Sequence, residues 1–103
     1  MKLKFVIAIF AAAGLYGTQV HANLTVLRAQ AQKGVPEAQL KLGELYQYGV
    51  GQQDHLVYAL SWYERAAPHL ARARVLATET ARGLTPEERL RAQALAQPLL
   101  GPP

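Results

Sequence analysis

Apolar side chains recur every three or four residues through most of the chain after residue 23, and glycines and prolines interrupt them at intervals. This spacing is typical of amphipathic helices, and no stretch shows the alternation of a β-strand. The interruptions divide the pattern into five segments, and we therefore predict an all-α domain. The predicted helices cover residues 24–33, 36–48, 55–67, 70–82 and 86–97.

The stretch 31–67 has the punctuation of a helical hairpin. Gly34 can end the first helix in a left-handed conformation, and Pro36 suits the first turn of the next helix. Gly43 lies inside a predicted helix, where it costs about 1 kcal/mol relative to alanine. We expect a neighbouring helix backbone to approach closely at this point. Asp54 is a candidate N-cap for the third helix, and the second and third helices should pack antiparallel.

A second start signal precedes the fifth helix. Thr85 can cap, Pro86 can take the first turn, and Glu88 can return a hydrogen bond to the cap, which is a capping box. Glu87 and Arg91 are spaced for an ion pair.

Each of the last four predicted helices has an apolar face. In chain order these faces are Ala38, Leu42, Leu45 and Tyr46; Leu56, Ala59, Leu60, Tyr63 and Ala66 or Ala67, with Trp62 beside them; Ala73, Leu76, Ala77, Ala81 and Leu84; and Leu90, Ala94, Leu95 and Leu99.

Residues 1–22 have the layout of a cleavable signal peptide. A basic start is followed by the apolar run Phe5 to Leu15, and Val20 and Ala22 place small residues before a cut after Ala22. The run is too short for a bilayer-spanning helix of about 20 residues. An uncleaved anchor or a buried first helix is the alternative. We expect a periplasmic or secreted protein with no membrane span after cleavage.

Composition adds two restrictions to this picture. The chain has no cysteine, so neither a disulfide nor a lipid-modified cysteine is available, and helix packing or a partner must supply stability. Loss of Lys2 and Lys4 with the signal would lower the formal net charge from +4 to +2. A nucleic-acid binder usually carries a denser basic stripe, so we expect no nucleic-acid partner.

One set of positions, most of them small or aromatic, is similar to a known repeat: Ala31, Gly34, Ala38, Gln39, Leu42, Gly43, Tyr46, Gly49, Gly51, Ala59, Trp62, Tyr63, Ala66 and Ala67. These residues resemble a Sel-one-like repeat, a unit of the tetratricopeptide-type helical solenoids. The resemblance implies a domain over 23–100, with a repeat core at 31–67, closing helices at 69–97 and a tail at 101–103. It also implies an adaptor that holds other proteins.

The chain departs from that family in two ways. His55 stands where the family usually has an aspartate in the turn before the second helix of the unit. The chain also has a single unit, whereas repeat proteins generally need about three to bury a continuous core. Flanking helices would then act as caps, and we expect self-association or further ordering by a partner.

No residue pattern predicts catalysis or a cofactor. His55 and His69 are far apart in the sequence, and no cysteine or paired-histidine motif accompanies them, so we expect no metal site. Ser61 lies outside any nucleophile motif. The glutamates are placed for helix faces or caps, and nothing indicates a pocket that would pair them.

Five side chains are candidates for a partner-binding surface. Tyr46, Tyr58 and Trp62 are aromatic, and aromatic residues are enriched at binding hot spots. The competing interpretation makes Tyr46 and Trp62 core residues and leaves Tyr58 as the better candidate for exposure. Arg72 and Arg89 belong to a basic face of the last two helices, which either solvates those helices or meets an acidic partner.

The sequence thus predicts an exported protein-interaction module without catalytic activity, whose partner it does not identify. Two alternatives stay open at this stage. One is an envelope enzyme or inhibitor with a small helical pocket, which would need convergent glutamate, histidine or arginine side chains. The other is a structural subunit that needs its complex in order to fold.

Overall fold

The computed structural model describes residues 23–49 and 53–97. Within these ranges the chain is all-α and contains no strand, as predicted. Residues 23–33 are helical, followed by α2 (Pro36–Gln47), α3 (His55–Ala66), α4 (Ala71–Arg82) and α5 (Pro86–Ala96). The predicted signal peptide and the 101–103 tail lie outside the described residues. In the described ranges, no helix has the length and apolar character needed to cross a membrane.

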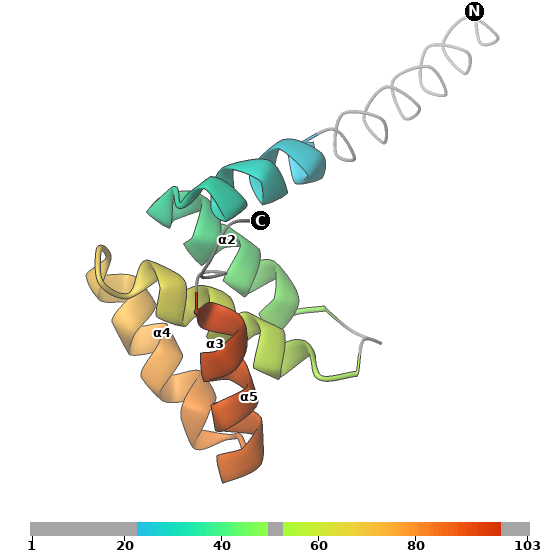
Figure 1. Cartoon of the computed structure of the whole chain (residues 1–103), viewed down its shortest axis with the longest axis vertical. Coiled ribbons are helices and arrows are strands. Elements are labelled where there is room, and N and C mark those ends of the chain that lie inside the picture. The colour runs from blue at the N-terminus through green and yellow to red at the C-terminus, as the bar shows by residue number, and fades with distance from the viewer. Residues whose placement is uncertain (1–22, 50–52, 98–103) are drawn as a thin grey trace, which may run out of the picture.

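Helix α3 is the central element of the described chain. It contacts α2 on one side and α4 and α5 on the other, and Figure 1 shows it between the 23–33 segment with α2 and the α4–α5 pair. Two clusters of buried side chains follow this division. The N-terminal cluster is Ala31, Ala38 and Leu42, and the C-terminal cluster is Val57, Leu60, Leu84 and Ala92.

The α2–α3 contact explains the glycine inside α2. A Cβ on Gly43 would lie 2.6 Å from two ring carbons of Tyr63 and 3.3 Å from the carbonyl oxygen of Ala59. The close approach expected at this glycine is confirmed, but the nearest group is the aromatic ring of Tyr63, and the backbone of α3 lies farther away. Tyr63 is fully buried, and its hydroxyl donates a hydrogen bond to Oε1 of Gln47.

The residues at the helix ends agree with the sequence prediction only in part. Gly34 has a φ of 101°, as expected for a residue that ends a helix in the left-handed region. Asp54 holds the N-cap position of α3, but its φ is 64° and its side chain does not cap the helix. That carboxylate instead lies 3.1 Å from Nη2 of Arg91. The predicted capping role of Asp54 and the predicted Glu87–Arg91 pair are therefore wrong.

The predicted start of α5 is confirmed in detail. The backbone N–H of Glu88 donates to Oγ1 of Thr85 over 3.1 Å, and the backbone N–H of Thr85 donates to Oε1 of Glu88 over 2.9 Å. Pro86 occupies the first turn. Both bonds satisfy N–H groups that have no partner inside a helix.

Three of the predicted apolar faces need correction, those of α2, where Leu45 is exposed, α3 and α5. Leu90 is 66% exposed, Leu95 is 46% exposed and Ala94 is exposed as well, and α5 instead buries Ala92. A small residue on this face lets α5 lie close to α3, whereas the leucines point away from it. On α3, Val57 and Ser61 are buried in addition to the predicted stripe, because helices cover this element on both sides. Leu99 lies outside the described residues.

Candidate partner-binding groove

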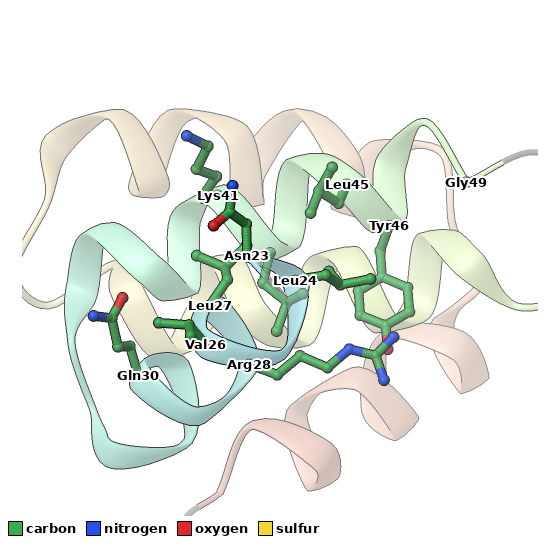
Figure 2. Close-up of a pocket in the computed structure, with 11 residues that line it drawn as sticks. Asn23, Leu24, Val26, Leu27, Arg28, Gln30, Lys41, Leu45, Tyr46 and Gly49 are labelled. Carbon is green, nitrogen blue, oxygen red and sulfur yellow. The ribbon is translucent and has the colours of Figure 1, made fainter. Parts of the chain in front are cut away.

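A groove of about 790 Å³ runs between the 23–33 helical segment and α2. Figure 2 shows the side chains that line it, which come from both elements. Its size is within the range of about 300–1,000 Å³ that is usual for binding pockets. Its apolar lining comes from Leu24, Val26, Leu27, Leu42, Leu45 and Tyr46, and its polar lining from Asn23, Arg28, Gln30 and Lys41.

The base of the groove belongs to the N-terminal cluster. Leu42 is buried, and Leu24 and Leu27 are half-buried where they pack against it. The rim is much more open, since Val26 is 55% exposed and Leu45 is 48% exposed. Leu45 was predicted to face the core with Leu42. It projects instead over the groove, where no described element covers it.

The charged side chains of the lining are all cationic. Arg28 comes from the helical segment and Lys41 from α2, and the described residues of the lining include no acidic side chain and no histidine. Neither cation has an ion pair or a side-chain hydrogen bond among the described residues. The groove therefore combines an apolar base with uncompensated positive charge.

Tyr46 and Tyr58 lie side by side, as a contact between α2 and α3. Their ring centroids are 5.5 Å apart, with an angle of 30° between the ring planes. Tyr46 is half-buried and lines the groove, whereas Tyr58 is exposed and is not part of the lining. Of the five candidate partner-binding residues, these two are brought together.

The other three candidates are not part of the groove lining, although Trp62 packs against the same N-terminal cluster as Tyr46. Trp62 is half-buried against the N-terminal cluster, and the guanidinium of Arg65 lies 4.5 Å from its ring centroid. Arg72 is 3.6 Å from the carboxylate of Glu44. Arg89 donates from Nη1 to two backbone carbonyl oxygens, those of Ala81 and Leu84, each at 3.2 Å. The structure therefore places Arg89 as a cap on the C-terminal end of α4.

Two of the residues considered for chemistry, His55 and Ser61, have side-chain hydrogen-bond partners. Nδ1 of His55 donates to the carbonyl oxygen of Tyr46 over 2.9 Å, near the end of α2, where the same oxygen also accepts from the backbone N–H of Gly49. The hydroxyl of Ser61 donates to the carbonyl oxygen of Tyr58 over 2.7 Å. Burial raises the pKa of Glu64 above its ordinary range. In the described ranges, histidine and acidic side chains do not gather into a possible metal site.

Sequence reasoning did not find the groove. Its walls are two consecutive helices, and it forms because Leu24, Leu27 and Leu45 spread from the buried stripe toward solvent. The only available signal was Val26 and Leu45, apolar residues at the edges of their helical stripes. Such residues are common on protein surfaces and do not by themselves indicate a site.

Comparison with protein-family models, with curated proteins and with solved structures finds no match for this chain. The resemblance to a Sel-one-like repeat accordingly stays a prediction. The observed feature that relates to it is the α2–α3 hairpin with Gly43 against Tyr63.

Proposed function

We propose that this protein is an exported protein-interaction module that docks a helix or an extended segment of another protein in the groove between residues 23–33 and α2. It holds its partner without performing chemistry on it. The observation that carries the proposal is the apolar groove itself, with its exposed rim at Val26 and Leu45. Contiguous apolar surface of this kind typically marks an interaction site.

The energetic argument follows from the exposure of the rim. Complete burial of a valine or leucine side chain stabilises by about 1.5–3 kcal/mol relative to full exposure. Val26 and Leu45 are about half exposed, so covering both would contribute on the order of 2 kcal/mol. Tyr46 and the outer atoms of Leu24 and Leu27 add to this when a partner covers the groove.

The polar lining favours docking over catalysis. General acid–base chemistry needs a group that gains or loses a proton near neutral pH beside the reacting atoms. The groove offers Arg28 and Lys41, together with the amides of Asn23 and Gln30. These groups orient and attract a ligand, and none of them is paired with a base or a nucleophile. This supports an adaptor over an envelope enzyme or inhibitor.

Export is the second part of the proposal, and it rests on the sequence of residues 1–22. The basic start, the apolar run and the small residues before position 23 support cleavage after Ala22. A cut at that point would make Asn23, which lines the groove, the new N-terminal residue. The partner would then be a periplasmic, secreted or envelope protein.

Site-specific photo-crosslinking in the producing cell tests the docking function. A photoreactive phenylalanine analogue replaces Leu45 on the groove rim, and in a matched control it replaces Val75. Val75 is 55% exposed on α4 and lies outside the groove. We expect a discrete crosslinked protein from position 45 and none of that mass from position 75. The same products from both positions, or no product from position 45, would contradict the proposal.

A further inference from the structure

We infer that the segment docking in the groove is an amphipathic helix whose apolar face is flanked by acidic side chains. This inference rests on the proposed docking function and specifies the chemistry of the partner. Two features of the groove support it, the sign and position of its charges and its open shape. A third argument is that a second copy of the chain on the groove would bring like charges together.

The charges lie on both walls. In Figure 2 the ammonium group of Lys41 and the guanidinium of Arg28 lie on opposite sides of Leu24 and Leu27. The 23–33 segment contains no acidic residue. On α2, Glu44 is within 3.6 Å of Arg72, and Glu37 is not part of the lining. A ligand in this groove therefore meets apolar surface in the middle and positive charge on each side.

An amphipathic helix matches that arrangement. Helix-in-groove recognition places apolar residues spaced by three, four or seven positions into the groove, and the neighbouring positions of the helix then face its two walls. Aspartate or glutamate at those positions would lie near Arg28 on one side and Lys41 on the other. Such pairs would favour the correct partner and reject a helix with basic flanks.

The open shape disfavours a small apolar ligand such as a fatty acid. Pockets for small ligands typically bury about 70–90% of the ligand surface. Here Val26 and Leu45 remain about half exposed along the rim, so a small ligand would stay largely in water. A helix needs to bury only one face. A single carboxylate headgroup would also leave one of the two cations unpaired.

A second copy of this chain is a poor occupant. In a two-fold symmetric dimer the same patch faces itself, so the groove of one copy would meet the groove of the other. Arg28 and Lys41 would then approach cations rather than acids. Like charges across an interface disfavour association. The self-association expected from the sequence would have to use another surface.

A peptide-display selection followed by matched binding measurements tests the inference. A library of helical peptides of about 15 residues is selected on the protein as the cell produces it. The best apolar face is then synthesised with glutamate, glutamine or lysine at its flanking positions, and binding is followed by fluorescence anisotropy. We expect the glutamate peptide to bind about tenfold more tightly than the lysine peptide at about 50 mM salt, and the ratio to shrink at about 500 mM.

Two pairs of variants locate the effect. Leu45→Glu should abolish binding of all three peptides, whereas Val75→Glu should not. The double variant Arg28→Gln with Lys41→Gln should reduce the preference for glutamate severalfold, whereas Arg82→Gln on α4 should leave it unchanged. Circular dichroism melts check that each variant is folded, and the comparison of peptides on the unmodified protein decides the charge preference without any variant.

The outcomes separate the inference from the proposed function. If the three peptides bind equally well and all depend on Leu45, the groove docks helices but the acidic flank is wrong. If no selected peptide depends on Leu45, helix docking in the groove fails as well. A fluorescent long-chain fatty acid that binds in a Leu45-dependent way while no peptide does would overturn both.

Discussion

The two ends of this molecule use similar leucines in opposite ways. At the C-terminal end, Leu84 is buried between α3 and α5 in the C-terminal cluster. At the N-terminal end, Leu45 lies one turn from the buried Leu42 and projects over an open groove. The difference is coverage: α4 and α5 close the space beside α3, while the outer side of the 23–33 segment and α2 has no described element over it. The N-terminal end is therefore where the chain has apolar surface left to offer.

The basic residues show the same contrast. Arg74 donates to the carbonyl oxygen of Ala67, Arg89 caps α4, and Arg91 pairs with Asp54. The side chains of these three arginines therefore make contacts within and between the C-terminal helices and α3. Arg28 and Lys41 at the N-terminal end have no such partners among the described residues. A basic face on the last two helices, expected from the sequence as a possible binding surface, is thus largely occupied by internal contacts.

The largest expected effect on stability comes from removing the side chain of Tyr63, a residue of α3, the helix that lies between the two ends. Tyr63→Ala should lower the free energy of unfolding by about 3–5 kcal/mol, because the ring is fully buried against α2. Trp62→Ala would cost as much if its ring were fully buried. Trp62 is half-buried, so we now expect roughly half that loss. Urea denaturation measures both, and equal losses would contradict the different burial of the two rings.

The next effect tests the close contact between α2 and α3. Gly43→Ala should destabilise by about 1–3 kcal/mol, because its Cβ would clash with the Tyr63 ring. Gly83→Ala is the matched control, since its nearest neighbour would be 3.7 Å away and its φ is −87°. That change should be neutral or stabilising by up to about 1 kcal/mol. Thermal melts that rank the two variants in the opposite order would remove the packing explanation of Gly43.

A smaller effect concerns the start of α5. Thr85→Ala removes the acceptor for the Glu88 N–H and should cost about 1 kcal/mol. Thr78→Ala provides the comparison, because its hydroxyl only donates to the carbonyl oxygen of Arg74 within α4. We expect that change to stay within about 0.5 kcal/mol of the unmodified protein. A loss at Thr78 as large as that at Thr85 would show that the capping box contributes little.

The smallest effects are pH-dependent and opposite in sign for two glutamates. The backbone hydrogen bond from Thr85 lowers the pKa of Glu88 below its ordinary 4.5. Its stabilising contribution is therefore present above 4.5 and is lost as pH falls through the lowered value. Burial raises the pKa of Glu64, so its contribution is present below 4.5 and is lost as pH rises through the raised value.

Glutamine substitutions separate the two glutamates. Denaturation curves recorded across the acidic range give the free energy of unfolding of each protein. The value for Glu88→Gln should lie furthest below that of the unmodified protein at higher pH, and the difference should shrink as pH falls. The free energy of unfolding of Glu64→Gln should increase relative to that of the unmodified protein as pH rises. Parallel pH profiles for all three proteins would contradict both assignments.

The sequence predicted the helices because their boundaries are local. Gly34 and Pro36 separate two helices by backbone chemistry alone, and the Thr85–Glu88 box depends only on residues within one turn. Each described helix accordingly ends within a residue or so of its predicted limit. Gly43 also predicted a close contact, because a glycine inside a helix lowers its stability and packing must offset that loss.

The burial faces and the groove were not predictable in the same way. Which face of α5 is buried depends on the angle at which it meets α3, and that contact selected Ala92 over Leu90. The exposure of Leu45 depends on where the 23–33 segment lies across α2. Both facts arise from packing between separate elements, and helical periodicity does not contain them. The partner-binding candidates named from sequence therefore share only Tyr46 with the groove.

The most direct test of the central claim keeps the reporter on one wall of the groove and changes the other wall. A photoreactive phenylalanine analogue at Val26 is combined in the producing cell with Leu45→Glu or with the matched change Val75→Glu. We predict that the crosslinked partner disappears with Leu45→Glu and persists with Val75→Glu, while both proteins accumulate and melt like the unmodified chain. Persistence of the crosslink with Leu45→Glu would show that the groove is not the docking site.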